Sequence, residues 1–267
     1  GLSPRAVPPL PPGRAVWVES GLVAQVALPP EHLCRCRSEL ASAKRPVTID
    51  TLPANVAPAM LPPATCPHGG VWQLPIGIGD DDLAPIALCL HPGEHALVAG
   101  PARSGRTTAL RALASAAARS HEQPRVVTLS TARSPVRAAC GTDPALAVDD
   151  LDRLAHVAAE GGPTLVLIDD AEAVDDAHGA LAALLAGAHP DLHVIAAGRA
   201  DALRASYRNW TRTVRASGVG LLLRPSIDLD GDLLGVTLPR RLPAPMQPGR
   251  GWLVDRGVTT YCQVAKD

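Results

Sequence analysis

The stretch GPARSGRTT, residues 100–108, has the spacing of a phosphate-binding loop with one departure. The pattern G-x-x-x-x-G-K-[ST] is met by Gly100, Gly105 and Thr107, but Arg106 stands where the pattern has lysine. In such a loop, backbone N–H groups surround the phosphates and the hydroxyl binds a magnesium ion. We therefore expect Thr107 to bind Mg²⁺. The residues expected to bind phosphate are Gly100, Pro101, Ala102, Arg103, Ser104, Gly105, Arg106, Thr107 and Thr108.

Arg106 limits what this loop can do. The residue keeps a positive charge, but its guanidinium is a planar fork rather than the compact ammonium of lysine. The geometry of its contact with the terminal phosphate should therefore be poorer than that of lysine, while its electrostatic attraction to the phosphate is kept. Only Lys44 and Lys266 are lysines among 25 basic residues, so the arginine also follows a bias of the whole chain. We expect nucleotide binding with slow hydrolysis, and Arg106 is one of two candidate catalytic residues.

The other candidate ends the apolar run TLVLIDD, residues 164–170. A loop of this kind needs an acid at the end of another buried strand, because that acid holds the magnesium ion that the loop hydroxyl also binds. We expect Asp169 to hold Mg²⁺, directly or through water. Asp170 stands where many such ATPases carry a glutamate that orients the attacking water. It is the second candidate catalytic residue, although its side chain is shorter by one methylene.

Alternating strands and helices must position these residues. Apolar runs predict strands at 95–100, 125–129, 164–170, 192–198 and 219–225. Helices are predicted at 105–120, at 149–160 with Asp149 or Asp150 as the cap, at 177–188 and at 200–216. Nearly continuous apolar strands between helices indicate an α/β fold with a mostly parallel sheet covered on both faces. Right-handed crossovers then give a RecA-like P-loop NTPase.

Two similar segments flank this region. PPGRAVWVESGLVAQVA at 11–27 and QPGRGWLVDRGVTTYCQVA at 247–265 both alternate apolar residues around a glycine turn, which predicts terminal β-hairpins. Their agreement at P-G-R, Trp, Gly and Q-V-A indicates a tandem array. We therefore expect three regions: the closing hairpin of a preceding repeat at 1–28, a Pro-rich linker with a short helix near 30–43 at 29–70, and the nucleotide-binding domain at 71–267.

Composition restricts the partners. With 25 basic and 26 acidic residues, the net charge of −1 provides no global attraction to nucleic acid or anionic lipid. The chain has no Phe, so aromatic side chains on which single-stranded bases could stack are scarce. Trp210, one of the few aromatic residues, is expected to pack in the core. No apolar run approaches the ~18–20 residues that span a bilayer. We expect this fragment to be soluble and cytosolic, with any membrane attachment made by parts outside this chain.

Five segments resemble FtsK/SpoIIIE-type ATPase domains. The similarity is greatest to the tandem ATPase domains of the EccC/EssC proteins of type VII secretion, and it covers about residues 70–267. Its downstream segments are more specific than the loop itself. The segments are LPIGIGDDDLAPIALCLHPGEHALVAGPARSGRTTALRALA (74–114), VLIDDAE (166–172), HVIAAGRADALRASYRNWTRTVRASGVGLLLRP (193–225), DGDLLGVTLPRR (230–241) and PGRGWLVDRG (248–257).

This resemblance implies an ATP-binding module that uses Mg²⁺, at the cytoplasmic face of the cell membrane in a membrane-anchored translocase. The implied partners are neighbouring ATPase domains of the same chain, further copies in a ring that is often hexameric, and the C-terminal signal peptide of a secreted substrate. No specific nucleic acid is implied. Active members carry Lys at position 106, so the arginine bears on hydrolysis and not on the fold.

Three functions therefore remain open. The preferred one is an ATPase-fold domain of a secretion translocase that hydrolyses ATP slowly and serves regulation or substrate recognition. The second is a motor that drives double-stranded DNA, against which the balanced charge argues. The third is a pseudo-ATPase that acts as a peptide-binding or assembly platform.

Overall fold

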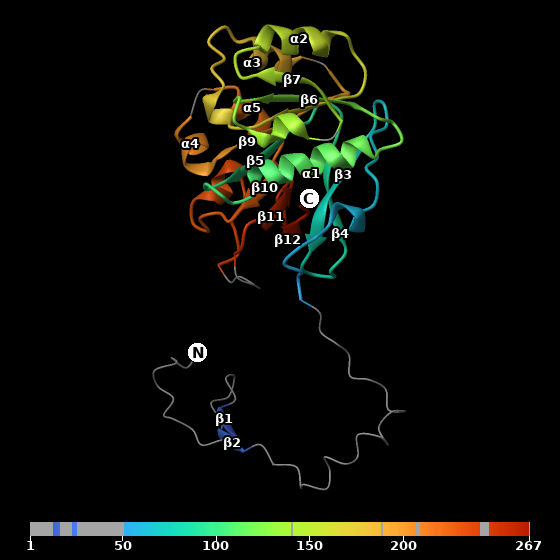
Figure 1. Cartoon of the computed structure of the whole chain (residues 1–267). Coiled ribbons are helices and arrows are strands. Elements are labelled where there is room, and N and C mark those ends of the chain that lie inside the picture. Colours follow the sequence, from blue (N-terminus) through green and yellow to red (C-terminus); the bar gives the residue numbers. More distant parts are fainter. Residues whose placement is uncertain are drawn as a thin grey trace. The chain divides into compact units, whose positions relative to one another are not determined.

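The computed structural model describes residues 13–16, 23–25, 51–139, 141–187, 189–206, 209–240 and 246–266. The chain divides into two compact units, Gly1–Ile49 and Asp50–Asp267 (Figure 1). In the first unit, β1 (Arg14–Val16) and β2 (Val23–Gln25) form an antiparallel hairpin, which confirms the predicted N-terminal hairpin over these residues. The short helix expected near 30–43 lies outside the described residues.

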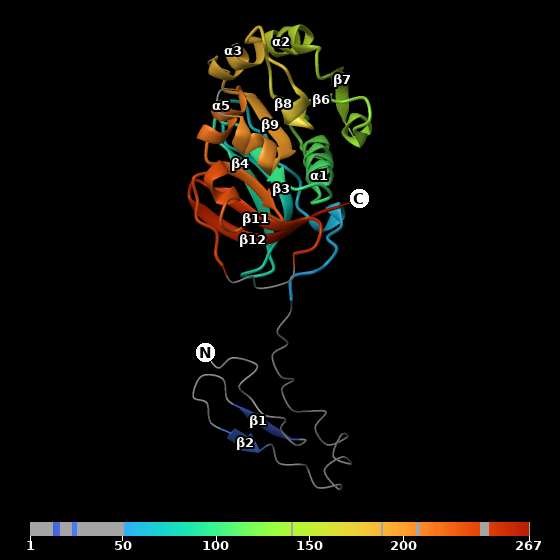
Figure 2. The same cartoon turned by 90° about the vertical axis from the view of Figure 1, so that its left-hand side faces the viewer.

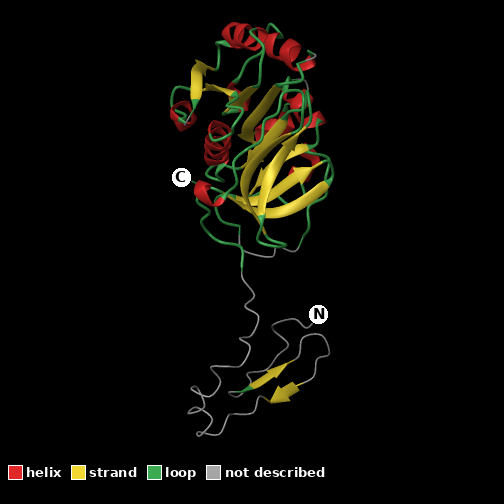
Figure 3. Cartoon of the chain, turned by 90° about the vertical axis from the view of Figure 1, so that its right-hand side faces the viewer, coloured by secondary structure: helices red, strands yellow, loops and turns green. Residues whose placement is uncertain are grey.

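The second unit is built on one ten-stranded sheet with the order β4-β3-β12-β11-β10-β5-β9-β8-β6-β7. Neighbours from β10 to β7 are parallel, and those from β4 to β10 are antiparallel. Figure 3 shows these strands side by side. The predicted mostly parallel α/β sheet is confirmed. The strands are β3 (Trp72–Gly79), β4 (Pro85–Leu90), β5 (Ala96–Gly100), β6 (Arg125–Ser130), β7 (Thr142–Ala147), β8 (Thr164–Ile168), β9 (Leu192–Arg199), β10 (Val219–Leu223), β11 (Arg250–Asp255) and β12 (Val258–Val264).

Helices cover both faces of this sheet. Figure 2 shows α1 on one side of the strands and α5 on the other. Small alanines on α1 are buried together with Leu110 and Leu113, so the helix axis can approach the strands closely. Within the described ranges, no helix combines the length and the apolar character needed to cross a membrane. The α-helices are α1 (Arg106–Ala118), α2 (Leu151–Ala159), α3 (Ala180–Ala186), α4 (Ala200–Ala205) and α5 (Thr211–Ala216), and the 3₁₀ turns are Pro58–Met60, Pro135–Ala138, Ala171–Ala173 and Asp230–Leu233.

The strand order brings distant residues to one edge of the sheet. The central strands β5, β8 and β10 are buried at every position, as their unbroken apolar sequences predict. The chain leaves β5 through α1 and re-enters the sheet at β6, passing over β9 and β8. Because these strands are parallel, their carboxyl ends share one edge, which is where ligands bind in open α/β sheets.

The two hairpins match in register as well as in sequence. Arg14 lies opposite Gln25 in the first hairpin, and Arg250 lies opposite Gln263 in the second. In both, the arginine Nε donates a hydrogen bond to the glutamine Oε1, at 3.3 Å and 3.2 Å respectively. The residues aligned by the P-G-R and Q-V-A agreement therefore pair in the same way in both hairpins.

Several features differ from the sequence predictions, among them the strands β3 and β4, which were not predicted. The helix expected at 200–216 is two short helices, α4 and α5, and Asn209 caps the second by accepting hydrogen bonds from the backbone N and Oγ1 of Thr211. The sheet also has an edge strand, β7, which was not predicted because Pro144 interrupts it; proline is tolerated at an edge. Finally, the compact unit begins at Asp50, ahead of the boundary expected at 71, because Leu52, Val56 and Leu61 are buried in its core.

Candidate nucleotide site

The loop between β5 and α1 has the backbone of a tight anion-binding turn. At Gly100 a Cβ atom would lie 2.4 Å from Leu223 O and 2.6 Å from Ser104 Oγ, so only glycine fits. Arg103 and Gly105 both adopt positive φ, at 59° and 105°, which turns the chain into the first turn of α1. The predicted strand–loop–helix order is thus present, with β5 ending at Gly100 and α1 beginning at Arg106.

A hollow of about 270 Å³ lies over this loop, and we call it the phosphate hollow. The first backbone N–H groups of a helix have no intrahelical partner, so the start of α1 presents N–H donors and the positive end of the helix dipole here. That arrangement binds anions without any side chain. The hollow contains most of the residues predicted to bind phosphate, and its lining residues are Pro101, Arg103, Ser104, Gly105, Arg106, Thr107, Thr108 and Pro248.

The C-terminal hairpin supports the loop from outside. The backbone N–H of Gly249 donates a 2.7 Å hydrogen bond to Ser104 O. A Cβ atom on Gly105 would lie 3.0 Å from Gly249 N, so the two backbones approach closely. The P-G-R turn that repeats at both ends of the chain is therefore, in this unit, part of the wall of the site.

Asp169 lies against the loop and contacts Thr107. It follows the end of β8 and is 2% exposed. Its Oδ2 accepts hydrogen bonds from Thr107 Oγ1 at 2.9 Å and from Ser134 Oγ at 2.5 Å. Its Oδ1 is buried and has no hydrogen-bond partner in the described part of the chain. A buried carboxylate oxygen without a donor is costly unless a cation or a proton compensates it.

Arg106 folds back onto its own loop. Its Nη1 donates to Gly100 O at 2.6 Å and to Pro101 O at 3.4 Å, and its Nη2 lies 3.8 Å from Asp170 Oδ1. Only 12% of the side chain is exposed. Contact with a terminal phosphate would therefore require this guanidinium to give up some of these contacts.

The side chain of Asp170 already has two partners, Arg106 and Thr131. Its backbone adopts a left-handed conformation with φ 55°, and its side chain is 38% exposed. Besides the contact with Arg106, Oδ2 accepts a 3.4 Å hydrogen bond from Thr131 Oγ1. Asp169 and Asp170 thus have different surroundings: one is buried against two hydroxyls, and the other borders the loop arginine.

The structure adds two residues that the sequence reading missed. Thr131 and Ser134 belong to the loop after β6 and touch Asp170 and Asp169, which lie 39 and 35 positions further along the chain. The only local signal was the Ser-Pro pair at 134–135, which begins a 3₁₀ turn with Ser134 as its cap. That signal predicts a turn but does not identify the carboxylate that the hydroxyl contacts.

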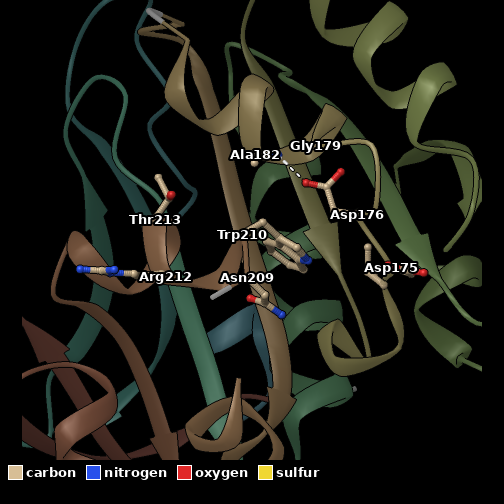
Figure 4. Close-up of a pocket in the computed structure, with 9 residues that line it drawn as sticks. Asp175, Asp176, Gly179, Ala182, Asn209, Trp210, Arg212 and Thr213 are labelled. Atoms are coloured by element: carbon tan, nitrogen blue, oxygen red, sulfur yellow. Dashed lines mark hydrogen bonds between the residues drawn. The ribbon is translucent and has the colours of Figure 1, made fainter. Parts of the chain in front are cut away.

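A separate hollow of about 670 Å³ lies between α3 and α5, and we call it the α3–α5 hollow. Trp210 forms part of its wall and is 4% exposed, which confirms that this tryptophan packs in the core (Figure 4). Its indole Nε1 has no hydrogen-bond partner in the described part of the chain. Asp176 caps α3 by accepting from the backbone N of Leu181 and of Ala182. The lining residues are Val174, Asp175, Asp176, Gly179, Ala182, Asn209, Trp210, Arg212 and Thr213.

No family model and no curated protein matches this sequence. Solved structures do match. The cytoplasmic domain of the type VII secretion ATPase EccC of Thermomonospora curvata has a TM-score of 0.66 and 19% identity, covering 98% of this chain and 35% of that one. The chain has the fold of an FtsK/SpoIIIE-type ATPase domain.

Two further structures agree with this result. ATPases 2 and 3 of Thermomonospora curvata EccC, in complex with a signal sequence peptide, give a TM-score of 0.66 and 23% identity over 98% of this chain and 55% of that one. ATPases 2 and 3 of EssC from Geobacillus thermodenitrificans give 0.61 and 17% over 100% and 57%. The chain therefore spans between about a third and three fifths of these proteins. The RecA-like α/β fold predicted from the sequence pattern is confirmed.

Proposed function

We propose that this chain is an ATP-binding domain of a type VII secretion translocase, which binds MgATP at the phosphate hollow and hydrolyses it slowly. The observation that carries the proposal is the contact of Thr107 and Asp169 beside that hollow, with one carboxylate oxygen left without a donor. Mg²⁺ is held in proteins by one or two carboxylates, substrate phosphates and water, so this donor set suits it. Similarity to the EccC and EssC structures supports the translocase context.

Each predicted site residue has a role in this proposal. Backbone N–H groups of Pro101 to Thr108, apart from Pro101 itself, bind the phosphates, while Thr107 and Asp169 hold the metal ion. Bound Mg²⁺ supplies charge neutralisation at the phosphate oxygens. Asp170 orients the attacking water, and its contacts with Arg106 and Thr131 compete with that task. Arg106, bound to Gly100 O, contributes charge near the phosphates but weak contact, which makes hydrolysis slow.

Calorimetric titration with MgATP tests this proposal. We expect the wild type to bind, and Thr107→Ala to lose about tenfold or more in affinity, because it removes the hydroxyl proposed to bind Mg²⁺. Arg106→Lys should raise the hydrolysis rate above that of the wild type. Absence of binding in every form contradicts the proposal and favours the pseudo-ATPase alternative. Salt-dependent binding of duplex DNA would instead favour the DNA-translocating motor.

The remaining parts of the proposal concern assembly. We propose that the domain works at the cytoplasmic face of the membrane, next to ATPase domains of the same chain and in a ring of copies. The matching hairpins support the tandem arrangement, because Arg14–Val16 and Val23–Gln25 repeat the pairing of β11 with β12. On this proposal, residues 1–28 complete a preceding repeat and 71–267 form the main body of the present one.

A second candidate function, peptide recognition, is favoured by the α3–α5 hollow. Its volume of about 670 Å³ is in the range of ligand sites, and its lining combines apolar residues, among them Val174, Ala182 and Trp210, with polar ones. One of the similar structures holds a signal sequence peptide. We propose that this hollow takes an apolar residue of a secreted substrate's C-terminal signal.

Fluorescence anisotropy with a labelled C-terminal signal peptide of a protein exported by the same system tests this candidate. Thr213 is exposed and lines the hollow, so Thr213→Arg should fill the hollow without disturbing the core and weaken binding about tenfold or more. The matched control is Thr237→Arg, since Thr237 is also exposed but lies outside this hollow. Equal weakening by both variants, or by neither, contradicts peptide binding at this site.

A further inference from the structure

A second hollow adjoins the phosphate hollow and shares Gly105, Thr108 and Pro248 with it. Its volume is about 290 Å³. A cavity of roughly 150 Å³ accommodates benzene, so this one has room for a fused two-ring base. A molecule with its phosphates over the loop would therefore place its remaining part here, against the C-terminal hairpin.

One wall of this hollow is the segment 52–56, which we call the strap. The buried Arg250 guanidinium binds the strap through Nη2, which donates to Leu52 O at 2.7 Å and to Pro53 O at 3.2 Å. Gln247 Nε2 donates to Ala54 O at 3.2 Å, and Lys266 N donates to Val56 O at 2.9 Å. Hydrogen bonds to its backbone carbonyls thus fix the strap on both sides of Asn55.

Asn55 is the one strap residue with an amide side chain. It is exposed, lines the second hollow, and makes no side-chain hydrogen bond within the described part of the chain. Gln263, on the opposite wall, is already committed: its Oε1 accepts from Gln247 and Arg250, and its Nε2 donates to Pro248 O and Val264 O. Gln247, the third amide that lines the hollow, uses its Nε2 to donate to Ala54 O and Gln263 Oε1. Of the three, Asn55 is the one whose donor and acceptor both lack a partner within the described part of the chain.

We propose that the second hollow binds the adenine of ATP and that Asn55 reads its edge. An asparagine amide matches this edge of adenine, because its Nδ2 donates to N7 and its Oδ1 accepts from N6. No aromatic residue lines the hollow, so discrimination depends on these hydrogen bonds rather than on stacking. This inference rests on the proposed function, since it assumes that the triphosphate lies over the loop.

Competition between MgATP and inorganic tripolyphosphate separates the two ideas. In calorimetric titrations of the whole chain, we expect the wild type to bind MgATP at least about tenfold more tightly than magnesium tripolyphosphate, and more tightly than MgGTP. Asn55→Ala should lower ATP affinity by roughly five- to a hundredfold, the range for one bidentate amide–base pair, and leave tripolyphosphate affinity unchanged. Gln73→Ala, which removes an exposed amide outside the hollow, is the matched control and should change neither.

Each alternative outcome has one meaning. If tripolyphosphate and ATP bind equally well to the wild type, or if Asn55→Ala keeps full ATP affinity and preference over GTP, the adenine site is overturned while the phosphate hollow stands. If neither compound binds, the proposed function itself fails and the adenine site fails with it.

Discussion

The Asp169 carboxylate joins the two loops that border the site. Its Oδ2 takes hydroxyl hydrogen bonds from Thr107 and Ser134, and its Oδ1 takes none in the described part of the chain. Thr107 comes from the loop that would bind the phosphates, whereas Ser134 comes from the loop after β6. Ser134 is therefore a positioning residue that holds Asp169 toward the loop hydroxyl.

Replacing Ser134 tests that role through stability. Ser134→Ala should lower the free energy of unfolding by about 1–3 kcal/mol, because a buried carboxylate loses one of its two donors. Ser134→Thr keeps the hydroxyl and should restore much of the loss. Urea denaturation of the magnesium-free protein at neutral pH provides the measurement.

A double-mutant cycle isolates the contact with Asp169. Ser134 Oγ also accepts a hydrogen bond from Val136 N as the cap of a 3₁₀ turn, so part of the cost arises there. In an Asp169→Asn background the charge is absent, and Ser134→Ala should then cost clearly less. The same cost in both backgrounds would show that only the cap matters.

Among the elements, those with a long local pattern were predictable. The strand β5, the loop and the helix α1 were predicted within about two residues, because glycine spacing and an apolar run fix them locally. Asp150 does occupy the predicted cap position of α2, but its Oδ2 accepts from Ala147 N and makes no cap hydrogen bond to the helix. The position of a residue within a helix or strand was thus easier to predict than its hydrogen-bond partner.

Contacts between elements were predicted only where a motif joined them. The pairing of Thr107 with Asp169 follows from a known division of labour around Mg²⁺. The strap does not follow from the sequence, because proline-rich composition indicates a linker, whereas Leu52 and Val56 are buried and Arg250 binds carbonyls nearly 200 positions away. Such contacts depend on the position of β11 within the sheet, which local patterns do not specify.

At the scale of the whole molecule, two buried histidines make stability depend on pH. His95, directly before β5, and His193, in β9, are 5% and 0% exposed. Burial, and then the charge of His193, lowers the pKa of His95 to about 4, and burial lowers the pKa of His193. Val194 N donates to His95 Nδ1, so that nitrogen carries no proton, whereas His193 Nδ1 donates to Glu94 O, a bond that favours the charged ring and is outweighed by burial.

The surroundings of the pair only partly offset these shifts. Glu94 and Asp191 favour the charged form of His193, and Glu94 also favours that of His95. Trp72 covers His193, with ring centroids 4.5 Å apart, and contributes no charge. Protonation of either ring in the folded state therefore places a cation in a largely apolar environment.

The sign of the pH effect follows from these pKa values. Below the ordinary histidine pKa of 6.5, His95 and His193 are protonated in the unfolded chain but stay neutral in the folded chain. The free energy of unfolding therefore falls as pH drops from about 6.5 toward 4. For His95 the full change corresponds to about 3 kcal/mol. Denaturation by urea at several values between pH 7.5 and pH 5 should show this slope. Across this range the exposed Glu122, Glu160 and Asp201, whose pKa values are lowered, remain ionised.

His95→Gln provides the decisive comparison. Glutamine can still accept from Val194 N, but it does not titrate, so the variant should lose much of the slope between pH 6.5 and 5 even if its stability at pH 7.5 is lower. His91→Gln is a suitable control, because His91 is exposed and its removal should leave the slope intact. An unchanged slope in His95→Gln would mean that the ring is protonated in the folded state and that its burial does not govern the response of the molecule to acid.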